Sequence, residues 1–242
     1  MPKKAFKAIL LTVPVLYVVG TPIGNLDDIT FRALETFRAV DMIACEDTRH
    51  TLKLLTHFDI HKPLLSCRAQ NEAAAADKII QLLTDGKSVA YASDAGTPGI
   101  SDPGAVLAGM VRKAGFKVAP VPGVSAFTAL VSAAGFGGKT LVFEGFLSPK
   151  PGRRKSRLRE LLESGNAAVL YESPFRIVKL LKDIADIESE RMVVIGRELT
   201  KVHEEIIEGT AAELLENFDA RESIKGEIAV FVTGAKNTSV FH

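Results

Sequence analysis

The sequence predicts an α/β protein, built from two α/β domains with mainly parallel sheets. From Val15 onward, short apolar runs of β-rich composition alternate with longer stretches of helical period. That alternation is typical of strand–helix units, which form parallel sheets. The pattern stops at residues 135–138 and then restarts, and three glycines in these four residues mark a boundary. We therefore expect an N-terminal domain over residues 15–137 and a C-terminal domain over residues 138–236.

Five strands are expected in the first domain, at residues 15–19, 41–45, 64–67, 88–93 and 117–121. Asp27 or Asp28 is expected to cap a helix in which Phe31, Leu34 and Phe37 recur at intervals of three. Further helices are expected at residues 49–57, 71–84, 103–114 and 125–134.

The second domain repeats the alternation with fewer elements. Strands are expected at residues 140–146, 167–172, 192–196 and 227–233. Helices are expected at residues 154–163, 174–184 and 211–217. No internal repeat is evident in the sequence.

The composition is that of an ordinary folded protein. The chain has 242 residues, of which 47% are hydrophobic, and a formal net charge of +1. An apolar content this high can fill a core, which excludes a disordered chain. The two cysteines, Cys45 and Cys67, provide neither a disulfide framework nor a four-cysteine zinc site, so a cytoplasmic location is expected.

The N-terminus superficially resembles a signal peptide, because three lysines precede an apolar run at residues 8–19. Pro14 interrupts that run, which is also shorter than the roughly 20 residues of a membrane helix. We expect a disordered leader over residues 1–14, a tail over residues 237–242 and no membrane association.

Four unusual segments follow predicted strands, at residues 20–25, 45–50, 93–104 and 122–126. The carboxyl ends of parallel strands form the crevice where open α/β sheets bind ligands. Taken singly, each segment also fits a tight turn or a helix cap. The 93–104 segment has three glycines and two prolines, which suit a close approach of backbone to a ligand. Together the four loops predict a sizeable small-molecule pocket.

The 45–50 segment concentrates charge at this edge, and Glu46, Asp47 and His50 raise the question of a metal site. No H-x-x-x-H or H-E-x-x-H spacing occurs in the chain, so no metal is expected. A second charged feature is a basic cluster in residues 150–159, which holds six cations and no acid. Such a run is either a solvated helix face or a site for phosphates, and the absence of compensating acids favours phosphates.

Six motifs in order resemble the RNA-acting branch of the tetrapyrrole methylase family, from about residue 17 to residue 236. These motifs are Thr21-Pro22-Ile23-Gly24-Asn25-Leu26, Glu46-Asp47-Thr48-Arg49-His50-Thr51, Asn71-Glu72, Ser93-Asp94-Ala95-Gly96-Thr97-Pro98, Tyr171-Glu172-Ser173 and Arg197-Glu198-Leu199-Thr200-Lys201. One departure is the stretch 68–72, which lacks the histidine that often precedes the Asn-Glu pair in this branch. No role of that histidine is therefore carried over to this chain.

The resemblance implies a class III methyltransferase fold, with S-adenosylmethionine in a cleft between two α/β domains and usually a homodimer. It also implies 2′-O-methylation of a cytidine ribose in the decoding region of small-subunit ribosomal RNA. The residues implied in cofactor binding are Pro22, Asp94, Ala95, Gly96, Thr97, Pro98, Ile100, Ser125, Ala126, Glu172, Gly226 and Glu227.

A ribose hydroxyl is a weak nucleophile until its proton is withdrawn, so the site needs a base or a group that stabilises the oxyanion. Asp47 is the first candidate for the base. Arg49 and His50 are expected to position RNA, and Lys201 to stabilise the alkoxide.

Three alternatives stay open at this stage. A methylase of the same fold could act on a tetrapyrrole or another small molecule. A phosphohydrolase could use Asp94, but Ala95-Gly96 stand where the second aspartate of its motif belongs. A non-catalytic RNA-binding protein could use the basic cluster, although only 7% of residues are aromatic.

Overall fold

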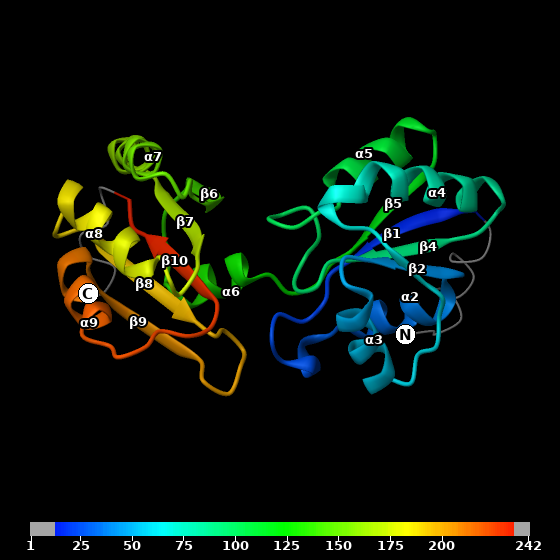
Figure 1. Ribbon diagram of the computed structural model, residues 1–242, viewed down its shortest axis with the longest axis horizontal. Helices are drawn as coiled ribbons and strands as arrows, with labels where there is room; N and C mark the ends of the chain where they lie inside the picture. The colour runs from blue at the N-terminus through cyan, green and yellow to red at the C-terminus, as the bar shows by residue number, and fades with distance from the viewer. Residues whose placement is uncertain (1–12, 235–242) are drawn as a thin grey trace. The chain divides into compact units, whose positions relative to one another are not determined.

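The computed structural model describes residues 13–234 and divides the chain into two compact units (Figure 1). The first unit is Met1–Ser125 and the second is Ala126–His242. The tail expected at 237–242, and all of the expected leader but Val13 and Pro14, lie outside the described residues. The division precedes the glycine-rich segment at 135–138, because helix α6 (Ala126–Ala133) packs on the second sheet.

The first unit contains a fully parallel sheet with strand order β3-β2-β4-β1-β5 (Figure 1). Its strands are β1 (Val15–Val19), β2 (Met42–Cys45), β3 (Leu64–Ser66), β4 (Val89–Ala92) and β5 (Lys117–Val121). All five predicted strands are present. Because the strands are parallel, the segments that follow β1, β2, β4 and β5 emerge at one edge of the sheet.

Helices cover both faces of this sheet. One face packs against α2 (Phe31–Ala39) and α3 (Thr48–His57), through a core that includes Phe37 and Leu55. The other face packs against α4 (Glu72–Thr84) and α5 (Ala105–Lys113), through a core that includes Ile79 and Leu107. Both faces are thus buried, as is usual for parallel sheets.

The expected aspartate cap of the first helix is wrong. Asp27 and Asp28 lie in a short 3₁₀ helix, η1 (Leu26–Asp28). Thr30 caps α2 instead, since its hydroxyl accepts a hydrogen bond from Ala33 N at 3.1 Å. A threonine directly before the first helical residue is the better cap, because its side chain reaches the third amide of the helix. A second 3₁₀ helix, η2 (Ala69–Asn71), precedes α4.

The second unit has the strand order β6-β7-β10-β8-β9. Its strands are β6 (Leu141–Phe146), β7 (Ala167–Glu172), β8 (Met192–Arg197), β9 (Glu205–Thr210) and β10 (Ile228–Val232). Only β6 and β7 pair in parallel; the other three pairings are antiparallel. The α/β class is confirmed, but the expectation of a mainly parallel sheet holds for the first unit alone.

One connection explains the antiparallel pairing of β8 with β9, and composition explains why β9 was not predicted. The segment 198–204 joins β8 to β9 and is short enough to reverse the chain directly. Strand β9 was absent from the sequence prediction because Glu205, Glu208 and Gly209 give it a polar, edge-strand composition.

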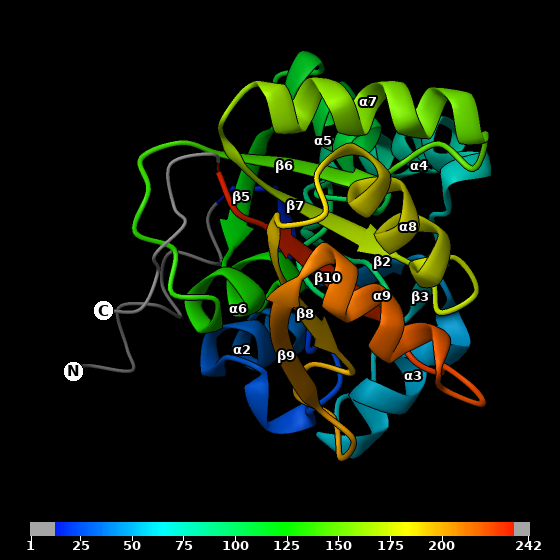
Figure 2. The same cartoon turned by 90° about the vertical axis from the view of Figure 1, so that its left-hand side faces the viewer.

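Three helices cover one face of the second sheet, namely α7 (Pro151–Glu163), α8 (Ile177–Ile187) and α9 (Ala211–Asp219) (Figure 2). Leu158, Leu181 and Phe218 carry their apolar faces into the core with the strands. Helix α6 packs on β10 from the opposite face, where the Phe136 ring, just beyond the helix, lies against Phe231. The second unit therefore has its own core.

Candidate active site

Backbone hydrogen bonds join the loops after β1 and β4. Thr21 N donates to Gly96 O at 2.9 Å, and Gly96 N donates back to Thr21 O at 3.1 Å. Gly96 has a φ of +73°, a conformation that glycine adopts without strain. Pro22 is buried beside this bridge, so the first and third predicted loops meet as the sequence indicated.

The loop after β5 is equally close to the loop after β1. Gly20 N donates to Val121 O at 3.0 Å. A Cβ added at Gly20 would lie 2.8 Å from Gly123 Cα, so both positions require glycine. Thr97 Oγ1 also donates to Val124 O at 3.0 Å, and the following Ser125 is buried. Three loops thus form one continuous backbone surface at this edge of the sheet.

The loop after β2 joins the same group through Asp94. The Asp94 carboxylate accepts a hydrogen bond from Asp47 N at 2.9 Å. Asp94 is the first of the cofactor-binding residues expected at 94–100. The last of them, Ile100, has a half-exposed side chain. The second and third predicted loops are therefore also in contact.

Asp47 caps the N-terminus of α3 and forms an ion pair with Arg49. Its carboxylate accepts from Arg49 N at 2.8 Å, from Nε at 3.2 Å and from Nη2 at 2.7 Å. The Arg49 hydrogen bonds hold the pKa of Asp47 well below its usual range. A carboxylate with a lowered pKa is a weak proton acceptor, which counts against Asp47 as the base. His50 follows on α3 as an exposed side chain.

Glu46 is a candidate base that the sequence pattern did not indicate. It is half-buried at the carboxyl end of β2. Burial raises the pKa of Glu46, and the nearby charges of Asp94 and Asp102 raise it further. A carboxylate with a raised pKa, next to other polar groups at a sheet edge, is typical of a catalytic acid or base.

The Asn71-Glu72 motif fixes the far end of the glycine-rich loop. The buried Glu72 carboxylate accepts from Gly104 N at 2.8 Å and from Leu107 N at 2.9 Å, which caps α5. Gly104 has a φ of +131°, and a Cβ there would lie 2.8 Å from the Tyr91 ring. Asn71 Nδ2 donates to Ser66 O at 3.3 Å. The motif therefore has a positioning role that the sequence pattern alone left open.

In the second unit, Glu172 ends β7 as a buried carboxylate. Its Oε1 accepts from Ser173 N at 2.8 Å. Its Oε2 lies 3.1 Å from the Arg176 guanidinium, yet no donor of the described residues makes an aligned hydrogen bond to it. Burial raises the pKa of Glu172. A buried carboxylate oxygen with a free lone pair fits a ligand hydroxyl or amine.

Lys201 belongs to a compact cluster at the same edge, since Ile228 of β10 pairs with both Glu172 and Arg197. Its ammonium donates to Glu198 Oε1 at 2.8 Å and to Glu227 Oε2 at 2.9 Å. Burial lowers the pKa of Lys201, but the two carboxylates outweigh burial and raise it overall. The lysine therefore stays charged at neutral pH.

The backbone of this cluster is conformationally unusual. Glu198 and Thr200 have φ values of 52° and 69°, although neither is glycine. Gly226 has a φ of +92°, and a Cβ there would lie 2.3 Å from the Glu198 side chain. Strained backbone of this kind gathers at functional sites. The cluster joins Lys201 with Gly226 and Glu227, which the sequence analysis had assigned to separate roles.

The structure therefore collects the predicted residues into two groups. The first unit holds Asp47, Arg49, the 94–100 loop and the buried Pro22 and Ser125 at one sheet edge. The second unit holds Ala126 at the start of α6, and Glu172, Lys201, Gly226 and Glu227 at its own sheet edge.

The basic cluster differs from its prediction, because acids of other elements compensate half of it. Arg154 is buried and pairs with Asp183 at 2.5 Å. Lys155 pairs with Asp186 at 2.8 Å, and Arg157 pairs with Glu144 and with Glu160 in its own helix. The uncompensated members, among described residues, are Lys150, Arg153 and Arg159, all exposed.

The described residues, 13–234, also bear on metals and membranes. No group of three or more His, Cys, Asp or Glu side chains in this range could hold a metal ion. Within the same range, no helix is long and apolar enough to cross a membrane.

The architecture is that of a known class of methyltransferases. The solved structure of the methyltransferase CobJ matches with a TM-score of 0.68 and 19% identity, covering 93% of this chain and 95% of that one. A cobalamin biosynthetic enzyme, cobalt precorrin-4 methyltransferase, matches with a TM-score of 0.66 and 17% identity, covering 96% and 97%. At these identities the likeness shows the fold alone, which is the two-unit fold of these methyltransferases.

Sequence relatives define the family more closely. The family model for tetrapyrrole (corrin/porphyrin) methylases matches residues 15–215. Curated relatives called ribosomal RNA small subunit methyltransferase I are 45% identical in Borrelia garinii subspecies bavariensis and in Thermotoga maritima, each over 90% of this chain and 98% of the relative. The chain belongs to this methyltransferase family, which confirms the resemblance.

Proposed function

We propose that this protein transfers a methyl group from S-adenosylmethionine to the 2′-hydroxyl of a cytidine ribose in small-subunit ribosomal RNA. The name of the relatives supports RNA as the substrate. The observation that carries the donor is the backbone surface of the first unit, where the loops after β1, β4 and β5 meet at Gly20, Gly96 and Gly123. The proposal includes a cytoplasmic homodimer.

The residues present fit the donor. Its adenine and ribose need backbone groups within reach, and the three glycines let the loops approach one another closely, which places their amides and carbonyls side by side. Pro22, the 94–100 loop and Ser125 with Ala126 would hold the nucleoside part. Glu172 offers a buried carboxylate oxygen that is ion-paired with Arg176 but accepts no aligned hydrogen bond from the described residues. Gly226 and Glu227 would complete the contacts.

The donor supplies an electrophilic methyl carbon on its sulfonium when it is bound. Glu46 would accept the proton of the ribose hydroxyl, because its raised pKa makes it a better base than Asp47. Lys201 would stabilise the developing alkoxide, since its ammonium remains charged. Arg49, which is 84% exposed, and His50 would contact RNA.

A labelling experiment tests this function. Small ribosomal subunits and free ribosomal RNA from cells that lack the gene are incubated with the protein and methyl-labelled S-adenosylmethionine. A 2′-O-methyl group blocks alkaline cleavage at the next phosphate, so the label should appear in an alkali-resistant dinucleotide that begins with cytidine. Label in mononucleotides would contradict ribose methylation, and label only in an added tetrapyrrole would contradict the RNA substrate.

A further inference from the structure

Two phenylalanines of the second unit are unusually exposed. The Phe175 side chain, just before α8, is 87% exposed, and Phe146 at the end of β6 is 60% exposed. Rings this exposed gain only part of the stabilisation that burial provides. Exposed apolar groups that gather into one patch with a polar rim mark interaction sites.

The two rings lie near the carboxyl ends of neighbouring strands: Phe146 is the last residue of β6, and Phe175 lies between β7 and α8. Phe146 pairs in register with Tyr171 of β7, and their rings lie 5.7 Å apart. Arg176, the residue after Phe175, donates from its guanidinium to Leu147 O at 2.9 Å. This hydrogen bond ties the start of α8 to the segment that follows β6. Phe146 and Phe175 therefore project from adjoining segments.

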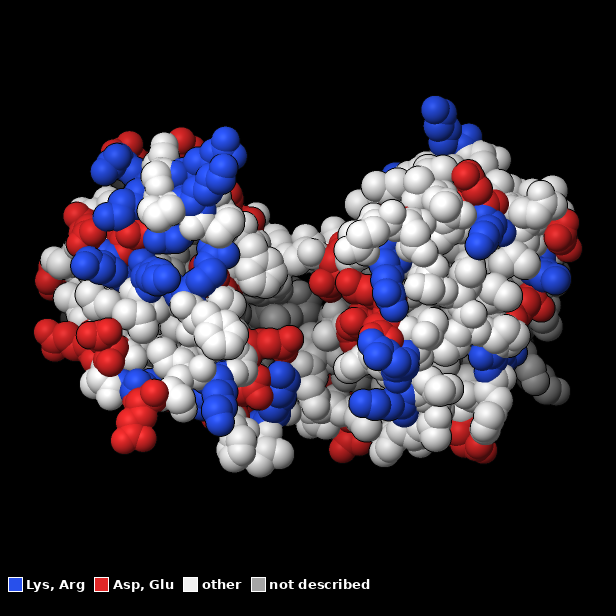
Figure 3. Space-filling view, in the orientation of Figure 1, with Lys and Arg blue, Asp and Glu red and all other residues white. Residues whose placement is uncertain are grey.

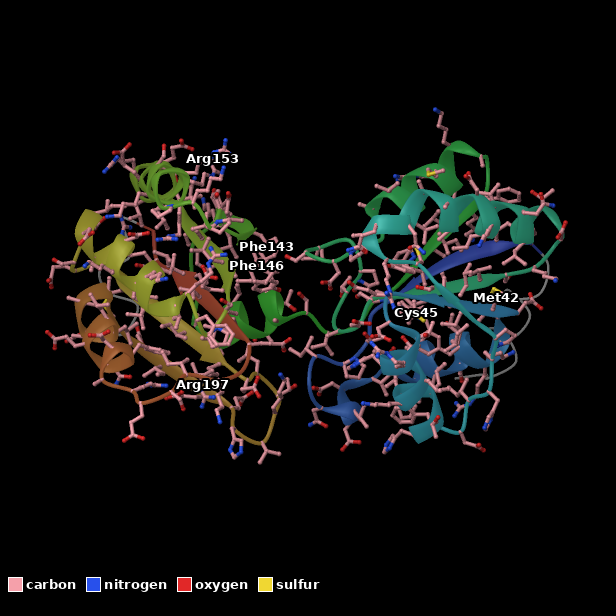
Figure 4. All side chains as sticks on the ribbon, in the orientation of Figure 1. Met42, Cys45, Phe143, Phe146, Arg153 and Arg197 are labelled. Atoms are coloured by element: carbon pink, nitrogen blue, oxygen red, sulfur yellow. The ribbon has the colours of Figure 1, made fainter. Side chains whose placement is uncertain are left out.

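Two of the cations without a carboxylate partner among the described residues, Lys150 and Arg153, follow Phe146 closely in the sequence. Lys150 N donates to Ser148 Oγ at 3.3 Å, and Arg153 follows in the first turn of α7. Both side chains are exposed, and no carboxylate of the described residues pairs with either. Figure 3 shows Lys and Arg side chains gathered over α7, and Figure 4 labels Phe146 and Arg153 in the same unit.

We propose that Phe146, Phe175, Lys150 and Arg153 form a binding surface for single-stranded RNA, called here the aromatic–basic surface. Bases would stack on the two rings, and the cations would contact the neighbouring phosphates. Unpaired RNA fits this chemistry better than a duplex, because stacked and paired bases cannot reach a protein ring. This proposal rests on the proposed function, since it specifies how the second unit recognises the RNA substrate.

Alanine variants of the two rings test the surface. Each stacked base contributes roughly 5- to 150-fold in affinity. Phe175→Ala and Phe146→Ala should each weaken binding of a fluorescent 12-nucleotide oligocytidine by at least 5-fold. Phe175→Tyr keeps a ring and should retain affinity. Binding of a perfect RNA duplex should change less than twofold in all variants.

Phe31→Ala is the matched control, because Phe31 is 88% exposed and lies on α2 of the first unit. It should bind the oligonucleotide like the parent. Parent-like binding by both Phe175→Ala and Phe146→Ala would overturn the surface. Loss of self-association in these variants, with RNA affinity unchanged, would also overturn it and assign the rings to a contact between copies.

The methyl-transfer assay separates this proposal from the function on which it rests. If the parent methylates ribosomal RNA and the ring variants bind RNA normally, the surface fails and the function stands. If the parent transfers no methyl group to RNA but the ring variants still lose oligonucleotide affinity, the proposed function fails and the surface stands.

Discussion

The two units hold their functional edges together by different means. In the first unit the loops after β1, β4 and β5 are joined by backbone hydrogen bonds and by the close approach of Gly20 to Gly123. In the second unit, ion pairs between side chains hold Lys201 and the start of α7. Backbone contacts fix the positions of amides and carbonyls, which suits a nucleoside. Ion pairs fix the positions of charged side chains, and the unpaired cations among the described residues of the basic cluster, Lys150, Arg153 and Arg159, suit a polyanion.

This difference predicts where mutations act. Changes in the glycine-rich loops or at Glu46 of the first unit should alter donor affinity or the rate of transfer. Changes among the cations at residues 150–159 of the second unit should alter either folding or RNA binding, according to whether the cation is paired.

The largest expected effect is on folding. Arg154→Ala leaves Asp183 as a buried carboxylate without its closest partner, and breaking a buried pair costs about 3–5 kcal/mol. Urea unfolding should show this loss, whereas Arg153→Ala on the neighbouring exposed position should change stability by less than about 0.5 kcal/mol. Equal stability of the two variants would show that the paired and unpaired cations do not differ.

Glu46→Gln should lower single-turnover methyl transfer by roughly 10² to 10⁴, the usual contribution of a general base. Its stability at pH 7 should not fall, because the raised pKa of Glu46 means that the folded protein disfavours the ionised carboxylate. That disadvantage is present above the raised pKa and disappears below the ordinary pKa of glutamate. A variant that is stable but slow separates catalysis from folding.

The pH dependence of transfer distinguishes Glu46 from Asp47. If Glu46 is the base, the rate should fall as the pH drops through a pKa above the usual 4.5. The pKa of Asp47 is lowered, so a base at Asp47 would keep the rate level until far more acidic pH. If the rate stays level as the pH falls and the Asp47→Asn variant transfers methyl groups slowly, Asp47 is the general base instead of Glu46.

Gly20→Ala tests the backbone surface. The new Cβ would lie 2.8 Å from Gly123, and relieving such overpacking costs about 1–3 kcal/mol. We expect a loss of S-adenosylmethionine affinity of about 10-fold by calorimetry, with RNA affinity unchanged. Gly109→Ala is the control, because nothing lies within 4 Å of its added Cβ in α5. Parent-like donor affinity in Gly20→Ala would place the donor elsewhere.

The smallest expected effect is on the salt dependence of RNA binding. Replacing Lys150, Arg153 and Arg159 with alanine should flatten the slope of log association constant against log salt by about 2 to 3 for ribosomal RNA. The exposed pair Lys78 and Lys87 provides a control outside the cluster. An unchanged slope in the triple variant would show that these cations do not contact RNA phosphates and only form a solvated helix face.

Sequence periodicity predicted the first unit well because β1, β2 and β4 are short, buried apolar runs between amphipathic helices. The second sheet was harder, because pairing direction depends on which strands meet and not on local composition. The acids that compensate Arg154 and Lys155 lie about 30 residues away in sequence, on α8, so the cluster looked unopposed.

The candidate site also has features that the sequence shows and features that only the folded structure shows. Glycine-rich loops after strands are visible in a sequence, and those at Gly20, Gly96 and Gly123 do meet. The roles of Glu46 and Glu72 depend on burial and on contacts between loops, which no linear pattern records.

Hydrogen exchange with and without S-adenosylmethionine tests the donor site most directly. Bound donor should slow amide exchange most in the first-unit segments 20–25, 93–100 and 122–125, with weaker protection at 171–173 and 226–228. Saturating donor that leaves the three first-unit segments unchanged would contradict the proposed binding surface.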